Sequence, residues 1–255
     1  MSKVLFGLIG YGAWGRHHAR VIAAGANTTL AAIAERSEAN RADARAAHPG
    51  VDIGDDIGTL LARPDIEVVD VALPSPLHHQ VGRAVLEAGK HLLMEKPMAL
   101  SIADCDDLVR FAASKNLRIA IGHEFRYSAL WGKVKELVDA GAVGDPQYAM
   151  IELWRNPSRL GTGGWRYDIR RVGNWILEEP IHFFDLARWY FSGFGNPVSV
   201  YARANARDPA HPELQDNFSA IVNFPGGRYA VVSQTLSAFE HHQVAKITGT
   251  KGAIW

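Results

Sequence analysis

A glycine-rich turn follows the first apolar run of the chain. The residues Gly10-Tyr11-Gly12-Ala13-Trp14-Gly15 match G-x-G-x-x-G and stand between a β-type run over 4–9 and a helical pattern over 13–24. In that context the first glycine permits a tight turn, the second lets the backbone approach a pyrophosphate, and the third lets helix and strand pack closely. N–H groups at the helix start can bind the phosphates. The turn therefore predicts a dinucleotide-binding loop, with a plain strand–helix turn as the alternative.

The first half of the chain alternates β-type apolar runs with helical patterns. The runs span 4–9, 29–34, 66–73, 91–94 and 118–121, and the helical patterns span 13–24, 38–47, 77–88 and 102–115. This alternation predicts a parallel sheet wound on both faces by helices. We expect a doubly wound Rossmann domain over residues 1–122.

The pattern changes after Gly122. Helical patterns over 130–140 and from about Pro180 are accompanied by longer β-type runs, at 148–154, 198–205, 217–224, 228–236 and 244–248. Strands linked by turns, such as Pro225-Gly226-Gly227, predict an antiparallel sheet. Residues 123–255 are therefore expected to form an α+β domain. A strand starting at the last residues would leave an exposed edge, so we expect this sheet to be cut short at its carboxyl end.

Glu35 directly follows the second β-type run, twenty positions after Gly15. An acidic side chain there can accept hydrogen bonds from an adenosine ribose, and its charge opposes a 2′-phosphate. This favours NAD as cofactor. Arg36 follows directly and could bind such a phosphate, which leaves NADP open. A solvated charge at a strand end is the alternative for Glu35.

Lys96 stands in Glu95-Lys96-Pro97, directly after the β-type run over 91–94. Ligands of open α/β folds bind beyond the carboxyl ends of the strands, so Lys96 is expected to face the cofactor crevice. A lysine there can polarise a substrate oxygen or share its proton. The alternative is a surface lysine paired with Glu95.

Several stretches together resemble a known family. They are Gly10–Gly15, ALPSPLH at 72–78, EAGKH at 87–91 leading into Glu95-Lys96-Pro97, GNWILEEPIHFFDL at 173–186 and GTKG at 249–252. The sequence resembles the glucose-fructose oxidoreductase and inositol dehydrogenase family, Gfo/Idh/MocA. The resemblance implies an NAD(P)-dependent oxidoreductase that transfers a hydride between a secondary alcohol of a sugar or polyol and the nicotinamide ring. It also implies that cofactor contacts come from Leu73, Pro74, Ser75, His78, Glu95 and Lys96.

The resemblance assigns His182 as the general base, with Glu178 in the place of an assisting aspartate. Alcohol oxidation needs a base for the hydroxyl proton, and a histidine titrating near neutrality suits that role. A neighbouring carboxylate can fix its tautomer and stabilise its charge. Four positions apart, the two side chains would share a face if both lay in one helical turn. Lys96 is expected to act on the same hydroxyl, while a structural role is the alternative for His182.

Further substrate contacts are expected from Arg126, Tyr127 and Trp165. The first two resemble an Arg–aromatic pair of the family, although a stabilising arginine at the domain boundary is equally compatible with the sequence. Trp165 belongs to a segment, 154–175, that is rich in tryptophan and arginine. Aromatic faces and guanidinium groups suit carbohydrate, and the same composition suits a subunit contact.

Composition limits the partners. Lys plus Arg and Asp plus Glu each total 27, so charge gives no reason to expect nucleic acid or an anionic membrane. The single cysteine, Cys105, excludes an internal disulfide and a multi-cysteine metal site, and fits the cytoplasm. No metal and no membrane span are expected. A broad sheet with one face to cover predicts a homodimer or homotetramer, as in similar proteins.

Two other functions are compatible with the same motifs. One is an NAD-dependent glycosidase or lyase that oxidises its substrate only transiently. The other is a non-catalytic NAD-binding sensor on the same fold, because fold does not fix function.

Overall fold

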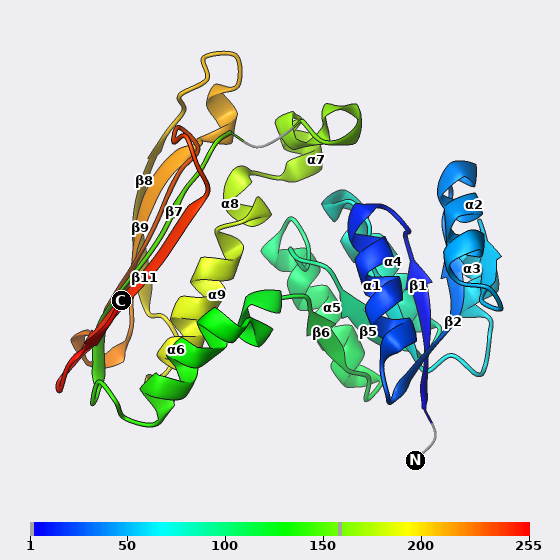
Figure 1. The fold of residues 1–255 in the computed structure, drawn as a ribbon, viewed down its shortest axis with the longest axis horizontal. Helices are drawn as coiled ribbons and strands as arrows, with labels where there is room; N and C mark the ends of the chain where they lie inside the picture. Colours follow the sequence, from blue (N-terminus) through cyan, green and yellow to red (C-terminus); the bar gives the residue numbers. More distant parts are fainter. Residues whose placement is uncertain (1–2, 158–159) are drawn as a thin grey trace. The chain divides into compact units, whose positions relative to one another are not determined.

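The computed structural model describes residues 3–157 and 160–255. The chain divides into two compact units, one ending at Gly122 and one beginning at His123 (Figure 1).

The amino-terminal unit is built on a six-stranded parallel sheet of order β3-β2-β1-β4-β5-β6. Its strands are β1 (Val4–Ile9), β2 (Thr28–Ala34), β3 (Asp52–Gly54), β4 (Val68–Val71), β5 (His91–Met94) and β6 (Ile119–Ile121). Its helices are α1 (Ala13–Ala24), α2 (Glu38–Ala47), α3 (Ile57–Leu61), α4 (His78–Glu87) and α5 (Ile102–Ser114). The expected doubly wound Rossmann architecture is confirmed.

Helices cover both faces of this sheet, because neighbouring residues on a strand point to opposite sides. On β1, Leu8 packs with Ala19 and Ile22 of α1, whereas the adjacent Ile9 belongs to a second core cluster. That second cluster holds the buried residues of α4 and α5, including Val85 and Leu108. The two apolar layers fix α1 on one face and α4 on the other, and so position the loops at the strand ends.

The carboxy-terminal unit contains a second six-stranded sheet, of order β12-β11-β7-β10-β9-β8. Its strands are β7 (Pro146–Trp154), β8 (Ser199–Asn205), β9 (Asn217–Asn223), β10 (Tyr229–Thr235), β11 (His242–Gly249) and β12 (Ala253–Ile254). Its helices are α6 (Ala129–Asp139), α7 (Ile169–Val172), α8 (Trp175–Glu178) and α9 (Ile181–Tyr190).

This second sheet is mixed rather than wholly antiparallel, which corrects the expectation from the sequence. β7 lies between β10 and β11, parallel to β10 and antiparallel to β11. The hairpin rule applies only to strands joined by tight turns. Residues 155–198 separate β7 from β8, so no tight turn requires β7 to be antiparallel to β10, the strand beside it.

Helix α9 supplies much of the core of this unit. Phe183, Leu186, Ala187 and Tyr190 follow the helical i, i+3, i+4, i+7 spacing and are all buried against the sheet strands. Figure 1 shows α6 and α9 on one face of the sheet. This packing fixes the start of α9, which carries His182 in its first turn and Asp185 in its second. Within the described part of the chain, no helix is long and apolar enough to cross a membrane.

Candidate functional site

The glycine loop has the backbone that its motif requires. Gly10 has φ +95°, and a Cβ there would lie 2.4 Å from the carbonyl oxygen of Ala72. A Cβ on Gly15 would lie 2.1 Å from the carbonyl oxygen of Gly10. A Cβ on Gly12 would meet no atom within 4 Å. Two glycines are therefore required by the packing of loop, strand and helix, whereas Gly12 borders open space.

That space lies at the amino terminus of α1. Gly12 caps the helix with no side-chain hydrogen bond, so the first-turn N–H groups are left for another acceptor. A phosphate suits such a place because the helix dipole and the N–H groups both favour an anion. The side chain of Tyr11 is buried and packs edge-on against the ring of His48. Tyr11 therefore contributes only its backbone to the glycine loop. Ala13 and Trp14 are exposed in the first turn of α1.

A pocket of about 450 Å³ continues from the loop over the carboxyl end of the sheet. Its lining includes five residues that the sequence analysis assigned to the cofactor: Gly10, Glu35, Arg36, Leu73 and Pro74. Ser75, the next residue, is buried. The pocket and the open space at Gly12 together fit an adenosine and a pyrophosphate, so the residues present fit a dinucleotide.

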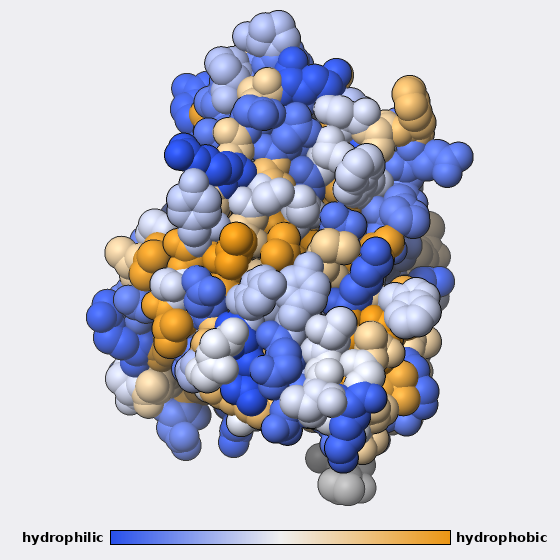
Figure 2. Space-filling model, turned by 90° about the vertical axis from the view of Figure 1, so that its left-hand side faces the viewer, coloured by the Kyte–Doolittle hydropathy of each residue, from blue (hydrophilic) through white to orange (hydrophobic). Residues whose placement is uncertain are grey.

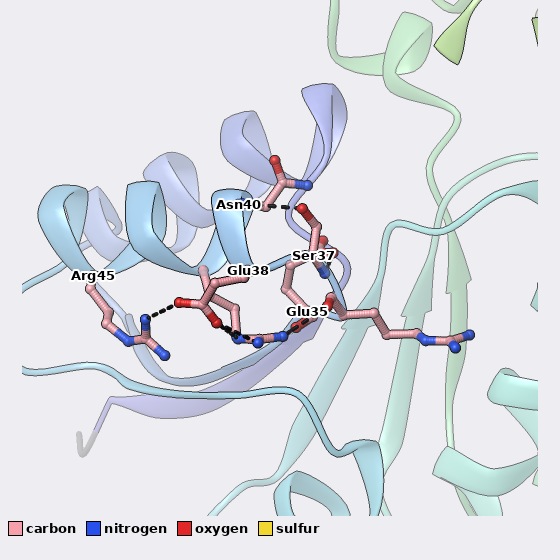
Figure 3. A network of polar contacts seen from close by, with 7 residues as sticks. Glu35, Ser37, Glu38, Asn40 and Arg45 are labelled. Atoms are coloured by element: carbon pink, nitrogen blue, oxygen red, sulfur yellow. Dashed lines mark hydrogen bonds and ion pairs between the residues drawn. The ribbon is translucent and has the colours of Figure 1, made fainter. Parts of the chain in front are cut away.

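Glu35 is oriented by two backbone N–H groups. Its Oε2 accepts from Tyr11 at 2.6 Å and its Oε1 accepts from Ser37 at 2.8 Å. Figure 3 shows Glu35 beside Ser37 and Glu38, the residues that cap and begin α2. A carboxylate has about four acceptor positions, so both oxygens can still accept from ribose hydroxyls. The neighbouring acid, Glu38, is instead paired with Arg41 and Arg45.

The side chain of His78 does not face the pocket, which corrects its assignment as a direct cofactor contact. It is fully buried, with Nδ1 2.6 Å from the carbonyl oxygen of Pro97 and Nε2 2.8 Å from that of Leu73. Although His78 is the first residue of α4, its ring points inward, because the loop after β4 and the turn after β5 each bring a carbonyl group to one of its nitrogens. His78 thus holds the loop after β4 to the turn after β5.

Lys96 lies in that turn, as its place in the sequence predicts. It is partly exposed, and its backbone N–H donates to Oε2 of the adjacent Glu95 at 3.2 Å. The Lys96–Pro97 peptide bond is cis. Glu95 is largely buried, so its side chain serves the turn rather than an open pocket surface.

His182 is in the first turn of α9 and is almost fully buried. The ring of Phe125 stacks on it, with centroids 4.6 Å apart and an angle of 19° between the planes. The ring of His123 meets it edge-on at 5.8 Å. Oε1 of Glu124 lies 3.5 Å from Nε2 of His182. The imidazole is therefore fixed by the turn Glu124–Tyr127 that follows β6.

Glu178 and His182 do not share one helix, contrary to the geometry considered from the sequence. Glu178 ends α8 and His182 lies in α9, with a break at Glu179-Pro180. Proline lacks the N–H that would continue the ladder, so a new helix begins after it. Oε1 of Glu178 accepts from Nε of Arg166 at 2.6 Å. Sequence reasoning missed Glu124, because no local spacing connects it with His182.

Arg126 makes a bidentate pair with Asp185 of α9. Its Nε and Nη2 donate to the two carboxylate oxygens at 2.7 and 2.6 Å. The pair ties the turn after β6 to α9, while two-fifths of the arginine side chain stays exposed. Tyr127 is almost fully exposed. Both interpretations of Arg126, as a substrate contact and as a stabilising group, fit this position.

The aromatic segment 154–175 divides between core and surface. Trp175 is fully buried in a small cluster with Val172 and Leu214. The indole of Trp165 packs over Gly161. The guanidinium carbon of Arg166 lies 4.7 Å from the centroid of the same indole ring. Residues 158–159 of this segment lie outside the described residues. Among the described residues, no group of three or more His, Cys, Asp or Glu side chains is placed to hold a metal ion.

Two family models match the chain. One, described as "Oxidoreductase family, NAD-binding Rossmann fold", matches residues 4–123, and the other, the GFO/IDH/MocA C-terminal domain, matches residues 131–255. The amino-terminal unit is therefore an NAD-binding domain, in agreement with the open glycine loop and its pocket.

Similar proteins include dehydrogenases of inositols. Inositol 2-dehydrogenase of Rhizobium meliloti is 28% identical, over 98% of this chain and 74% of that protein. A crystal structure of scyllo-inositol dehydrogenase from Lactobacillus casei with bound NAD(H) and scyllo-inositol has a TM-score of 0.84 and 25% identity, covering 99% of this chain and 76% of that one.

The similarity is not restricted to dehydrogenases. The 2,7-anhydro-N-acetylneuraminate hydratase of Mediterraneibacter gnavus is 28% identical, over 100% of this chain and 67% of that protein. The chain spans 52% of the length of two uncharacterized oxidoreductases of Schizosaccharomyces pombe that it also matches. Because family models match both units and the motifs lie where the fold requires them, the chain belongs to the GFO/IDH/MocA oxidoreductase family.

Proposed function

We propose that this protein oxidises a secondary hydroxyl of an inositol or a related sugar or polyol with NAD, or reduces the matching ketone. The observation that carries the proposal is the environment of His182, an imidazole fixed by Phe125 with the carboxylate of Glu124 near its Nε2. A histidine held in this way can take a proton in a defined direction. The inositol dehydrogenases among its relatives support the substrate class.

In this proposal, each group of residues has a separate role in the reaction. Gly12, Glu35 and the loop at Leu73-Pro74 hold the dinucleotide, which when bound supplies the acceptor for the hydride. Lys96 donates a hydrogen bond to the substrate oxygen and stabilises its developing negative charge. His182 removes the hydroxyl proton, and a neighbouring carboxylate stabilises the imidazolium that results. The carboxy-terminal unit supplies further substrate contacts through Arg126, Tyr127 and Trp165.

A panel of inositols, sugars and polyols with NAD and with NADP tests the proposal, followed at the nicotinamide absorbance. Net reduction of the cofactor with at least one inositol or sugar is expected. No reduction with any member of the panel, by a protein shown to bind NAD, contradicts it.

A second candidate is a lyase or hydratase that oxidises its substrate only transiently. The hydratase among the relatives favours it, because that protein is as similar to this chain as the inositol dehydrogenase is. Such an enzyme turns substrate over with no net NADH. Product analysis by mass spectrometry at constant nicotinamide absorbance separates the two functions.

We also propose that two or four copies associate through the open face of the second sheet. Tyr201, Ile221, Val231 and Met150 lie side by side on adjacent strands and point away from the core. Figure 2, which faces the left-hand side of Figure 1, shows apolar residues among polar ones on this side. Light scattering at micromolar concentration is expected to give a dimer or tetramer, and Ile221→Glu is expected to yield smaller species. A monomeric unaltered protein contradicts the proposal.

We infer that the protein acts in the cytoplasm, where its single cysteine stays reduced. Fractionation of cells that express the natural protein tests this inference, and recovery from a secreted or membrane fraction contradicts it.

A further inference from the structure

A histidine outside the sites described above is bound between two carboxylates. The ring of His18, on α1, has Nδ1 2.7 Å from Oδ2 of Asp70 and Nε2 3.0 Å from Oε1 of Glu95. Asp70 is on β4 and Glu95 directly follows β5. The three side chains are 18%, 1% and 13% exposed. One imidazole therefore joins the helix that begins at the glycine loop to the ends of two central strands.

The two contacts require two protons. An ionised carboxylate only accepts hydrogen bonds, and a neutral imidazole has a single N–H. Either His18 is an imidazolium, or one carboxyl group is protonated and donates to the ring. The hydrogen bonds that His18 makes to Asp70 and Glu95 raise its pKa to about 10, and burial raises the pKa of Asp70. The cluster thus keeps both protons throughout the neutral range.

Glu95 transmits this arrangement to the next residue. Its Oε1 is held by His18 and its Oε2 accepts the backbone N–H of Lys96. The carboxylate is fixed at both oxygens, and with it the start of the turn. On the other side of Lys96, the carbonyl oxygen of Pro97 is bound by His78. The backbone of Lys96 is therefore held between two histidine side chains that come from α1 and α4.

Two simpler explanations account for the cluster less well. The described residues include no group placed to hold a metal ion, so ligation does not explain it. Stability alone is a poor explanation, because burying charged groups costs desolvation energy and apolar residues often do as well in their place. What a buried charged network does provide is a fixed geometry.

We propose that His18 is a positioning residue for Lys96. Through Glu95 it sets the backbone from which the Lys96 side chain reaches the substrate oxygen. The same ring joins that turn to α1, so the loop that binds the dinucleotide phosphates and the lysine keep a constant relative position. The proposal rests on the role of Lys96 in the proposed function.

The test uses His18→Gln, alone and with Asp70→Asn. A glutamine amide can donate to one carboxylate, but its oxygen then faces the other. Asp70→Asn supplies a donor for that oxygen, which leaves the glutamine N–H groups for Glu95. In the proposed dehydrogenase reaction we expect His18→Gln to lower kcat at least tenfold, with the dissociation constant of NAD nearly unchanged. We expect the double variant to recover most of that loss.

His79→Gln is the matched control. His79 also pairs with two carboxylates, those of Asp104 and Asp107, but both of these residues lie on α5 rather than in the turn that carries Lys96. It should leave kcat unchanged even if the midpoint of thermal unfolding falls. A loss of kcat in His18→Gln that the His79 variant matches, or that follows the unfolded fraction, overturns the proposal.

A second readout needs no substrate. Reductive methylation with carbon-13 formaldehyde labels the lysine amines, and the Lys96 signal is identified by its absence in Lys96→Arg. We expect this signal to shift in His18→Gln, to return in the double variant and to be unchanged in His79→Gln. An unshifted signal in folded His18→Gln overturns the proposal. If the signal shifts as expected but the unaltered protein oxidises no polyol, the positioning role stands and the proposed function fails.

Glu95→Gln carries the same test if His18→Gln does not fold. Its side chain has one oxygen, which can stand at the position beside His18 or at the position beside the Lys96 N–H, but not at both. The Lys96 signal is expected to shift in this variant too, and an unshifted signal overturns the proposal.

Discussion

Oε1 of Glu124 lies 3.5 Å from Nε2 of His182, although 57 residues separate the two in the chain. The carboxylate therefore comes from the turn after β6. Glu178, four positions before His182, ends a different helix and binds Arg166. The two glutamates thus offer alternative partners for the proposed base.

The first prediction compares these two glutamates. Glu124→Gln removes a negative charge beside the ring, so the imidazolium formed during turnover loses stabilisation. We expect kcat to fall about tenfold. Loss of a neighbouring negative charge lowers the pKa of an imidazole by about one unit or more, so the acidic limb of the pH profile should move to lower pH. Glu178→Gln should cost less. A larger loss in Glu178→Gln, with both proteins folded, would return the assisting role to Glu178.

The second prediction concerns the two proton-handling groups. Lys96→Ala and His182→Ala should each lower kcat by about 10²–10⁴, the usual effect of losing a positioned acid or base. The affinity for NAD, measured by titration calorimetry, should hardly change. Because both groups act on one hydroxyl in the proposed function, the double variant should be far less impaired than the product of the two single losses. Near-normal turnover in His182→Ala removes it from the mechanism.

Cofactor choice provides the third prediction. The unaltered protein is expected to bind NAD more tightly than NADP, and Glu35→Ala should narrow the difference. The substitution removes a ribose acceptor and a charge that repels a 2′-phosphate. Glu38→Ala is the control, since that carboxylate is occupied by Arg41 and Arg45. Tighter binding of NADP by the unaltered protein would show that Arg36 decides the preference instead.

A fourth prediction separates folding from binding in the glycine loop. Gly12→Ala places its methyl group in open space at an ordinary backbone conformation, so the thermal midpoint should be unchanged while NAD binding weakens. Gly10→Ala is strained by its φ of +95° and meets the carbonyl oxygen of Ala72. It should lower the free energy of unfolding by at least about 1–3 kcal/mol. Unweakened NAD binding in Gly12→Ala would place the phosphates elsewhere.

The fifth prediction is a pH dependence of stability. Because the folded pKa of His18, about 10, exceeds its unfolded value, the folded state binds more protons above neutrality. The stabilisation is complete below about pH 6.5 and is lost as the pH rises toward about 10. Urea unfolding should give a smaller free energy at pH 9.5 than at pH 7, and His18→Gln should flatten this difference. An equal decrease in the free energy of unfolding between pH 7 and pH 9.5 in the two proteins would show that His18 is not protonated at neutral pH.

The amino-terminal unit could be predicted from the sequence largely because its signals are local. The glycine turn, the apolar run of β1 and the periodicity of α1 stand next to one another in the chain. The elements that were missed are β3, of three residues, and α3, of five. Elements that short carry too little periodicity to stand out from a loop.

The contacts of the candidate site could not be predicted in the same way. His18, Asp70 and Glu95 are distributed over three elements, and only the order of the strands brings them together. The same is true of Glu124 and His182. Lys96 could be placed because a rule connects strand ends with ligand sites. No comparable rule pairs a side chain on α1 with the residue that precedes that lysine.

The position of β7 has a consequence for how the second unit assembles. β8, β9 and β10 follow one another in the chain and pair in that order, so they can form from contacts between near neighbours. β11 has no partner in that meander, because β7 lies between it and β10. β11 and β12 can therefore pair only after β7, which lies some ninety residues earlier in the chain, has paired with β10 at the edge of the meander. Such distant pairings close slowly, so we expect the late, rate-limiting event in folding of this unit to be the insertion of β7.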